Sequence, residues 1–494
     1  MTGYSLPFQL PTIKDRVLEA HKYANWLVSL HARKHRSTVT ASTPWDVTLN
    51  VTTHCQLSCP YCETGNGSLQ RSSGLLTPDR FHYHMKPLYN NLFILRMFGT
   101  GESLLNRQFP KMIEKTKGKE IFSLLSTNLS LKFSDELIDE LLLCGLGIIA
   151  ISCDGTSQKT YEKYRRGGDY ELVIENMQRL IARKKALGLQ YPIIEWRFLV
   201  FEHNKHEIDR ARHLAWMYGV DQISIHAGSA PARGASVIRA TDVNLSPATV
   251  GPAFTDALKN KKTTLLDAIK KLPDEQRKTF GAIPPALRYS KCDWLYFGTT
   301  LFPSGGVSPC CVSNNEPNDF GTMDPATHAN FIKIWRNEKY REAREFFHPH
   351  KKNKEANVIC ASCPNMASMD SQFVMPLRAV LRNAPAWVLK ILACRPEIFF
   401  TNTDYYTLRP EMLGLQHCRS GLNNEVPADL IEAIRTHAGE ITNHSPILSE
   451  HYRLFANILE QGDATDTKGF EVIEKGIALS DELAHKTIAL SGDA

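Results

Sequence analysis

The chain has 494 residues, of which 43% are hydrophobic and 22% are charged, and this balance excludes a largely disordered protein and a coiled coil. No run of about 18 apolar residues occurs and the first residues contain no apolar export signal, so we expect a cytoplasmic protein without a transmembrane segment. The net charge of +6 is small for this length and gives no reason to expect nucleic acid as a partner.

Residues 1–44 are expected to form a helical extension, with an amphipathic helix over Ile13–Arg36 that ends in the basic run 33–36. A second stretch, Pro376–Arg395, also combines apolar residues with a basic rim. Such helices either make a peripheral contact with a membrane surface or pack on the rest of the protein with their charges solvated. We favour the second interpretation.

Residues 45–228 alternate short apolar runs with helical patterns, as parallel strands joined by crossover helices do. Ser134 is a predicted N-cap of a helix that ends before Gly145, and Gly188 closes the helix over Tyr170–Leu187. Roughly 185 residues are too few for a complete eight-fold barrel, which takes about 250. We therefore predict an α/β fold with a partial (β/α)6 TIM-like barrel, whose functional residues follow the strands. The predicted strands are Trp45–Thr52, Leu92–Phe98, Ile121–Ser126, Gly147–Ser152, Ile193–Val200 and Gln222–His226.

Three regions come after the barrel. Residues 229–290 show weak periodicity and are expected to form a connector. Residues 291–370 carry cysteines on Gly-, Pro- and Asn-rich loops with one helix at Phe331–Phe347, which indicates a small α+β domain. Residues 371–494 are expected to form a mostly helical C-terminal tail, most clearly over Ser449–Glu460 and Phe470–Ala484.

Twelve cysteines without an export signal indicate metal ligation or catalysis rather than disulfides. The first group, Cys55, Cys59 and Cys62, has Cys-x3-Cys-x2-Cys spacing directly after the first predicted strand. Three thiolates on one short loop suit a cubane [4Fe–4S] cluster whose fourth iron is open to a non-protein ligand. The alternatives are a zinc site, which is usually a closed tetrahedron built from paired Cys-x2-Cys knuckles, and three unrelated thiols.

The second group of cysteines lies on separate loops and comprises Cys292, Cys310, Cys360 and Cys363. Four thiolates can close either a zinc ribbon or a second iron–sulfur cluster. Cys311 is an alternative ligand because it is the neighbour of Cys310. The four remaining cysteines stand alone and are by default buried, unreactive thiols: Cys144, Cys153, Cys394 and Cys418.

The first cysteine triplet resembles the signature of the radical S-adenosylmethionine (radical SAM) enzymes. The resemblance implies that the open iron binds the amino and carboxylate groups of SAM. It further implies that the reduced cluster cleaves SAM to methionine and a 5′-deoxyadenosyl radical, which abstracts a substrate hydrogen. A flavodoxin- or ferredoxin-type reductant is implied as well. Tyr61 occupies the aromatic position before the third cysteine, and in the family the backbone at this position contacts the adenine of SAM.

Residues after the next strands extend the resemblance. Segment 98–105, Phe-Gly-Thr-Gly-Glu-Ser-Leu-Leu, is similar to the family's Gly-Gly-Glu-Pro motif, in which Glu102 would accept a hydrogen bond from the SAM ammonium. Thr100 and Ser103 depart from that motif, and Leu129 stands where the family has glycine. The other implied SAM contacts lie at or after the ends of the third and fourth strands and are Ser126, Asn128, Ser152 and Arg165.

Residues 292–363 resemble the SPASM extension of radical SAM enzymes, or its shortened twitch form. A full SPASM domain has seven cysteines and two auxiliary clusters, but here no cysteine follows Cys363 at the required spacing. The resemblance therefore implies one auxiliary [4Fe–4S] cluster in a small α+β iron–sulfur domain. Its implied ligands are Cys292, Cys310, Cys360 and Cys363.

We expect a radical SAM oxidoreductase that oxidises or epimerises a small polar metabolite, such as a sugar or aminocyclitol, in a biosynthetic pathway. Oxidation would use the auxiliary cluster as electron acceptor, whereas epimerisation needs a hydrogen-donating thiol, for which Cys153, Cys311 and Cys394 are candidates. One alternative is a maturase that forms a thioether or carbon–carbon crosslink in a ribosomally made peptide. The 44 residues before Trp45 are too few for the usual peptide-recognition domain. Another alternative is a non-catalytic iron–sulfur or electron-transfer protein, which would leave the SAM motifs without a purpose.

Overall fold

A single ten-stranded sheet organises the protein, with strands in the order β10-β9-β8-β1-β2-β3-β4-β5-β6-β7. The computed structural model describes residues 10–228, 292–347 except 328, 358–363, 373–401 except 395, 404 and 408–418. It also describes a few single positions between 248 and 273 and between 432 and 453. Among the described strands, the two ends of the sheet, β10 and β7, are not paired with each other, so the barrel is open.

The six central strands are parallel, and helices connect each one to the next. Each strand begins inside a predicted apolar run and ends inside that run or one residue beyond it. The prediction of an α/β partial barrel is therefore confirmed. A short strand β7, Ala248–Thr249, pairs antiparallel with β6 at one edge. The central strands are β1 (Asp46–Leu49), β2 (Ile94–Met97), β3 (Phe122–Thr127), β4 (Ile148–Ser152), β5 (Ile193–Val200) and β6 (Gln222–Ala227).

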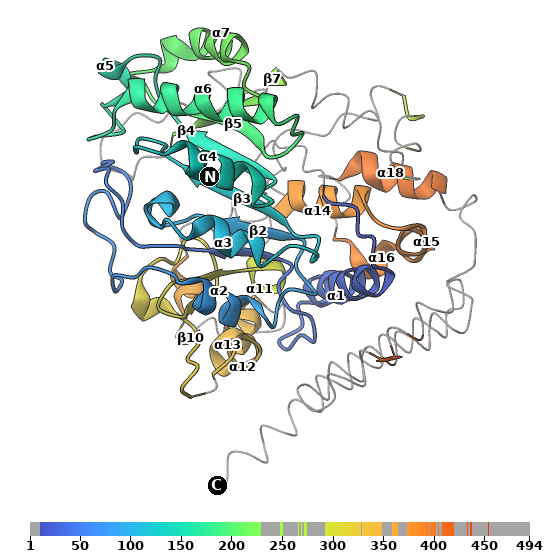
Figure 1. The fold of residues 1–494 in the computed structure, drawn as a ribbon. Helices are drawn as coiled ribbons and strands as arrows, with labels where there is room; N and C mark the ends of the chain where they lie inside the picture. Colours follow the sequence, from blue (N-terminus) through green and yellow to red (C-terminus); the bar gives the residue numbers. More distant parts are fainter. Residues whose placement is uncertain are drawn as a thin grey trace.

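The crossover helices cover the outer face of these strands (Figure 1). The predicted helix caps are confirmed, since Leu137 N donates to Ser134 Oγ (3.3 Å), and Gly145 and Gly188 follow their helices with φ of 106° and 62°. The helices and short 3₁₀ turns of this part are α2 (Pro78–Met85), η1 (Ser103–Leu105), α3 (Phe109–Glu114), α4 (Asp135–Leu143), α5 (Gln158–Tyr161), α6 (Tyr170–Ala186), η2 (Lys205–Glu207) and α7 (Ile208–Tyr218).

The outer and inner faces of the sheet differ in polarity, because successive residues of a strand point to opposite faces. On β5, Trp196 points outward and stacks on Tyr218 of α7, with ring centroids 6.4 Å apart. Its neighbours Glu195 and Arg197 point inward, where Ser224 of β6 hydrogen-bonds to Glu195. The inner face is therefore a polar surface enclosed by the curved sheet.

The second cysteine-bearing region continues the same sheet. Strand β8 (Gly298–Leu301) follows helix α11 (Trp294–Phe297) and pairs parallel with β1, Asp46 standing opposite Gly298. Strand β9 (Gly306–Ser308) pairs antiparallel with β8, and β10 (Gly321–Thr322) pairs antiparallel with β9. Turn η4 (Glu316–Asn318) lies between β9 and β10 in the sequence. Turn η5 (Ile359–Ser362) carries Cys360.

One predicted helix of this region is divided in two. Instead of a single helix over residues 331–347, the structure has α12 (Phe331–Trp335) and α13 (Glu338–Phe346). The second begins because the side chain of Asn337 accepts a hydrogen bond from Tyr340 N (3.1 Å), as an N-cap does.

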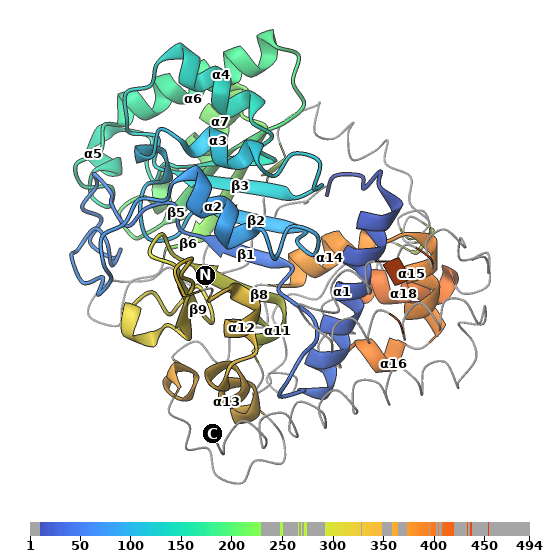
Figure 2. The same ribbon diagram turned by 60° about the horizontal axis from the view of Figure 1, so that its bottom comes forward.

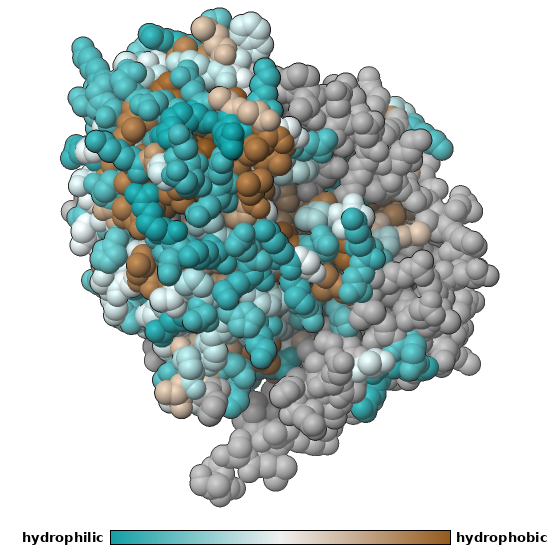
Figure 3. Space-filling view, in the orientation of Figure 1, coloured by the Kyte–Doolittle hydropathy of each residue, from teal (hydrophilic) through white to brown (hydrophobic). Residues whose placement is uncertain are grey.

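Helix α1 (Arg16–His35) packs against α11 and the C-terminal helix α16 (Pro396–Phe399) (Figure 2). The predicted stretch over residues 376–395 is divided by residues 383–385. Two of its basic side chains are not simply solvated: Arg378 and Arg382 contact Glu411 at 3.1 and 2.5 Å. On the face in Figure 3, hydrophilic residues predominate and hydrophobic ones form small groups. No helix in the described part of the chain is long and apolar enough to cross a membrane. The C-terminal helices are α14 (Val374–Arg382), α15 (Ala386–Cys394), α16 (Pro396–Phe399) and α18 (Arg409–Cys418).

Some expectations lie outside the described residues. They concern nearly all of the connector 229–290, the helices over 449–460 and 470–484, and the side chains of Cys394 and Cys418.

The basic end of α1 is held in a buried ion pair. The Arg33 side chain is 1% exposed. Its Nη1 and Nη2 lie 3.0 and 2.6 Å from the two carboxylate oxygens of Asp404, and Nη1 also lies 3.4 Å from Asp293 Oδ2. We expect Arg33→Ala to lower the free energy of unfolding by about 3–5 kcal/mol, because two carboxylates would remain buried without their cation. Urea unfolding followed by circular dichroism measures this loss.

The matched control is Arg183→Ala, which removes an equally short Arg–Asp pair (2.5 and 2.7 Å to Asp139) whose side chains are 48% and 32% exposed. Its expected cost is below about 1 kcal/mol. Equal urea midpoints for the two variants would contradict the assignment of Arg33 as a buried anchor.

Candidate functional site

The three cysteines of the first group lie on the loop after β1, at the carboxyl end of the parallel sheet. Cys59 is buried, while Cys55 and Cys62 are half-buried. The loop is tightly folded: Cys62 N donates to Cys59 O (3.2 Å), and a Cβ on Gly65 would lie 2.5 Å from Cys59 N. The sequence expectation that these thiols share one short loop after a strand is met.

The electrostatics of this loop suit a cationic metal group. Burial raises the pKa of Cys55 to about 11 and also raises the pKa of Cys59, so both thiols hold their protons until a cation compensates the thiolate. No three His, Cys, Asp or Glu side chains of the described residues converge closely enough to hold a single metal ion. A cubane cluster does not need such convergence, because each of its irons takes a separate thiolate. Three thiol donors on one loop fit the cluster that the sequence implies.

Glu102 is buried at the end of β2 and joins the ends of two strands. Its Oε1 accepts hydrogen bonds from Leu104 N (3.0 Å) and Thr127 Oγ1 (2.8 Å), and its Oε2 accepts one from Asn128 N (2.7 Å). Burial raises its pKa, and these hydrogen bonds oppose that effect. A carboxylate has about four acceptor positions, so Oε2 retains one for a ligand.

Asn128 connects Glu102 to the cysteine loop. Its Nδ2 lies 3.8 Å from Cys55 Sγ, and its Oδ1 accepts hydrogen bonds from Gln56 Nε2 (2.8 Å) and Ser130 N (2.9 Å). Asn128 is therefore fixed with an amide N–H directed at a candidate cluster ligand. Hydrogen bonds to such sulfurs are among the factors that set the potential of an iron–sulfur centre.

Two glycines allow this close approach of strand ends. A Cβ on Gly99 would lie 2.0 Å from Asn50 Oδ1, and one on Gly101 would lie 2.5 Å from Thr52 O. The Gly-Thr-Gly turn therefore has no room for side chains at its glycines. Thr100 between them is held by a hydrogen bond from its hydroxyl to Asn50 Oδ1 (3.1 Å).

Arg165, expected to contact SAM, lies in an ion pair. Its Nε is 2.6 Å from Asp154 Oδ2, and Asp154 Oδ1 accepts a hydrogen bond from Leu199 N (2.7 Å). The Arg165 guanidinium also lowers the pKa of the Cys59 thiol, against the larger effect of burial. The structure thus places Arg165 beside the cysteine loop.

Tyr61 is 37% exposed and belongs to an aromatic group beside the same loop. Its ring centroid is 6.0 Å from that of Tyr164 and 6.1 Å from that of Phe201, and the latter two lie 4.5 Å apart. These rings form one apolar wall next to the thiols.

The inner face of the barrel brings Ser126 and Ser152 together with residues that the sequence reasoning missed. Arg197 Nη1 lies 3.5 Å from Ser126 Oγ and its Nη2 lies 3.1 Å from Glu195 Oε2, while Ser152 is paired in register with Arg197. His226 on β6 is another residue of this polar inner face. Burial lowers its pKa to about 4, and the positive charge of Arg197 contributes to this shift. The sequence contained one signal for these inward-facing residues: the charged residues Glu195 and Arg197 occupy alternate positions of the apolar run 193–200.

The cysteines of the second group affect one another electrostatically. Besides burial, the Cys360 and Cys310 thiolates raise the pKa of Cys292, and Cys310 and Cys363 raise that of Cys360. Pairwise electrostatic effects thus link the four predicted ligands, whose role in a cluster remains a prediction. For Cys311, burial and Cys310 raise the pKa to about 12, whereas Arg96 of the inner face lowers it. This places Cys311 within electrostatic reach of the barrel interior.

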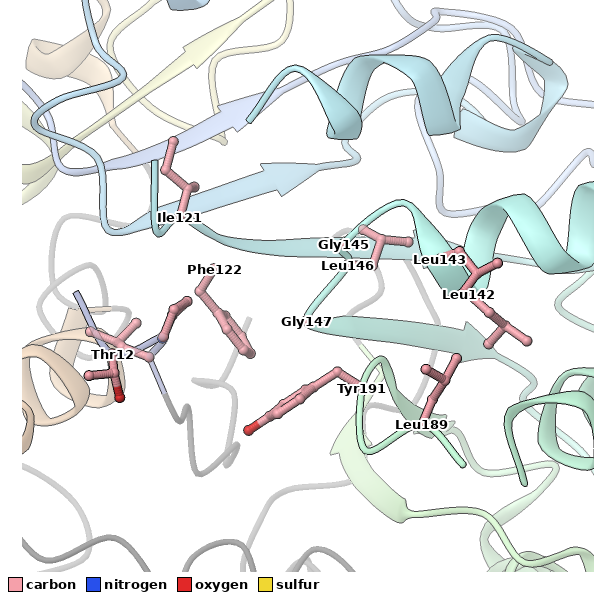
Figure 4. A pocket seen from close by; sticks show the side chains of 12 residues that line it. Thr12, Ile121, Phe122, Leu142, Leu143, Gly145, Leu146, Gly147, Leu189 and Tyr191 are labelled. Atoms are coloured by element: carbon pink, nitrogen blue, oxygen red, sulfur yellow. The ribbon is translucent and has the colours of Figure 1, made fainter. Parts of the chain in front are cut away.

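A separate cavity of about 400 Å³ lies at the other end of the strands (Figure 4). Its walls include Phe122 at the start of β3, Gly147 before β4 and Tyr191 before β5, together with Thr12 and Leu142. Because the cysteine loop comes after the carboxyl end of β1, this cavity is not part of the candidate site.

Comparison with protein families identifies two regions of the chain. Residues 49–193 match the radical SAM superfamily, and residues 292–364 match the SPASM iron–sulfur cluster-binding domain. No curated protein matches the chain.

Several solved structures share parts of the fold. SuiB of Streptococcus suis bound to S-adenosylmethionine is 13% identical, with a TM-score of 0.45, over 70% of this chain and 76% of SuiB. The structure of anSMEcpe with bound AdoMet is 12% identical, with a TM-score of 0.41, over 65% of this chain and 88% of that one. BtrN in complex with AdoMet and 2-DOIA is 13% identical, with a TM-score of 0.33, over 62% of this chain and 88% of BtrN. The family assignment depends on the two domain matches rather than on these similarities.

Proposed function

Since the chain is a radical SAM enzyme with a SPASM iron–sulfur domain, we propose that it oxidises or epimerises a small polar metabolite of the sugar or aminocyclitol kind. When bound, the catalytic cluster supplies the electron that cleaves SAM to methionine and a hydrogen-abstracting 5′-deoxyadenosyl radical, and the auxiliary cluster is an acceptor for the substrate's second electron. A flavodoxin- or ferredoxin-type protein supplies the initial electron.

Each group of candidate site residues has its own proposed role. Cys55, Cys59 and Cys62 hold the catalytic cluster, and the free acceptor position of Glu102 receives the SAM ammonium. The Tyr61 backbone contacts the adenine. The carboxylate and ribose of SAM are positioned by polar groups at the strand ends, namely Ser126, Asn128, Ser152 and Arg165. The auxiliary cluster is held by Cys292, Cys310, Cys360 and Cys363.

The observation that carries the choice of substrate class is the pairing of charges on the inner face. Among the described strands, Arg96 contacts Asp46 (2.6 Å) and Arg197 contacts Glu195 (3.1 Å), so both guanidinium groups already have a carboxylate partner. An anionic substrate would compete with these buried partners. Hydroxyl-bearing substrates match this surface better, because serine hydroxyls and the His226 Nε2, which has no partner among the described residues, exchange hydrogen bonds with them.

The two reactions differ in the steps after hydrogen abstraction. In oxidation, the substrate radical loses one further electron and a proton, which completes a two-electron change. In epimerisation, a thiol returns a hydrogen atom, and the thiyl radical regains an electron from the reductant and a proton from water. Of the candidate thiols, Cys153 lies on the outer face and donates to Gly155 O (3.7 Å), and the Cys394 side chain lies outside the described residues. Cys311 is therefore our proposed donor for epimerisation.

The test uses the full chain, reconstituted anaerobically with iron and sulfide and supplied with dithionite and SAM. We expect 2-deoxy-scyllo-inosamine or neutral sugars to increase 5′-deoxyadenosine formation above the rate without substrate, and glucose 6-phosphate not to do so. Glu195→Gln removes the negative charge that pairs with Arg197, so we expect the discrimination between neutral sugars and glucose 6-phosphate to weaken. Stimulation by peptides alone, or by no neutral sugar or cyclitol, would contradict the proposal.

A further inference from the structure

Two segments, each continuous with a predicted cluster ligand, lie against each other. The first, the loop arm, comprises residues 63–74 after Cys62, and the second, the auxiliary arm, comprises residues 310–319. Backbone pairing joins them, since Glu316 N donates to Gln70 O (2.8 Å). Side chains add further bonds: Asn314 Nδ2 donates to Glu63 Oε2 (2.8 Å), and Ser72 N and Oγ donate to Glu316 Oε2 (2.7 and 2.6 Å).

An enclosed ion pair lies at the centre of this contact. Arg71 Nη1 and Nη2 lie 2.8 and 2.7 Å from the two carboxylate oxygens of Asp319, and Arg71 Nε donates to Asn314 O (2.7 Å). The guanidinium also lies 3.3 Å from the ring centroid of Phe302. The Arg71 side chain is 0% exposed and that of Asp319 is 7% exposed.

The surrounding backbone leaves space for this pair. A Cβ on Gly306 would lie 2.2 Å from Asp319 Oδ2 and 2.8 Å from Arg71 Nη1, so only glycine fits at this position of β9. All three guanidinium nitrogens of Arg71 are directed at the auxiliary arm. Lysine would keep the charge but could not make all three of these bonds, because an ammonium is a point donor.

We propose that the Arg71–Asp319 pair is a latch that positions the two metal-binding segments relative to each other. Arg71 is nine residues after Cys62, and Asp319 is nine residues after Cys310, so the latch connects the loop of one cluster to the loop of the other. It is a positioning device, and neither of its members is a catalytic residue. The inference rests on the proposed function only in taking both segments as cluster sites.

The first test measures amide hydrogen exchange in the full chain without metal, for wild type, Arg71→Ala, Asp319→Ala and the double variant. We expect exchange in both arms to accelerate at least about ten-fold, because a broken buried pair leaves an unpaired charge. The double variant should add little to either single variant, and Arg71→Lys should restore part of the protection. Arg183→Ala is the control, since it breaks an exposed pair on the helical layer.

Unchanged exchange in the two arms would overturn the latch, and so would equal acceleration in β3–β5, which would indicate general destabilisation. The second test uses the reconstituted chain, in which the magnetic coupling between the two reduced centres is followed by electron paramagnetic resonance. Arg71→Ala should weaken this coupling, and an unchanged coupling would overturn the positioning role. A wild-type chain that binds only one cluster would contradict the proposed function, while the exchange experiment would still decide the latch.

Discussion

Replacement of Cys55, Cys59 and Cys62 by alanine is expected to abolish SAM cleavage and to reduce the bound iron from about eight to about four per chain, as expected when one of two cubane clusters is lost. The physical reason is the donor set: no other described thiol group lies on the loop after β1, and Glu102 and Asn128 converge on this loop. Iron and sulfide analysis and the yield of 5′-deoxyadenosine under dithionite measure the two effects.

The matched control is Cys144→Ala. Cys144 is a buried thiol that donates to Leu141 O (3.3 Å) at the end of α4, distant in sequence from both cysteine groups. This variant should keep its iron and its SAM cleavage. A triple variant that still releases 5′-deoxyadenosine would refute the assignment of the catalytic site.

Replacement of Cys360 and Cys363 by alanine is expected to remove about four irons while SAM cleavage continues, since the remaining cluster has its own three ligands. Oxidation of the substrate should be lost, because it then has no second electron acceptor, whereas epimerisation through Cys311 does not need this acceptor. Iron analysis, 5′-deoxyadenosine yield and substrate consumption separate these outcomes.

The neighbours Cys310 and Cys311 provide a paired control. Cys310 acts electrostatically on Cys292 and Cys360, whereas Cys311 lies within reach of Arg96. We therefore expect Cys310→Ala to lose auxiliary iron and Cys311→Ala to retain it. About four irons and one zinc in the wild-type chain would refute the auxiliary cluster.

Several features of the fold were predictable because they depend on neighbours in sequence. Apolar runs of strand length marked all six central strands, and Ser134 and Gly145 marked the ends of α4. The longer helical stretches were less accurately predicted. The capping side chain of Asn337 divided one of them, a local effect that the apolar pattern does not reveal.

The basic residues at both ends of the chain show a different limit. Their pattern was compatible with a membrane surface, yet Arg33 contacts Asp404, 371 residues away in sequence, and Arg382 contacts Glu411. The partner of a charged residue depends on which elements pack together, which periodicity does not contain.

The sequence by itself determined the family, the cysteine triplet and the chemistry expected of it, because cysteine spacing and strand-end motifs lie within short stretches of chain. Only the tertiary structure decided that β8 extends the sheet beside β1, that Arg165 pairs with Asp154, and that Arg71 meets Asp319. It also revealed that Glu195 and Arg197 face the interior together with His226. Each of these contacts joins segments that are distant in sequence. Which segments meet depends on burial and charge pairing in the folded chain.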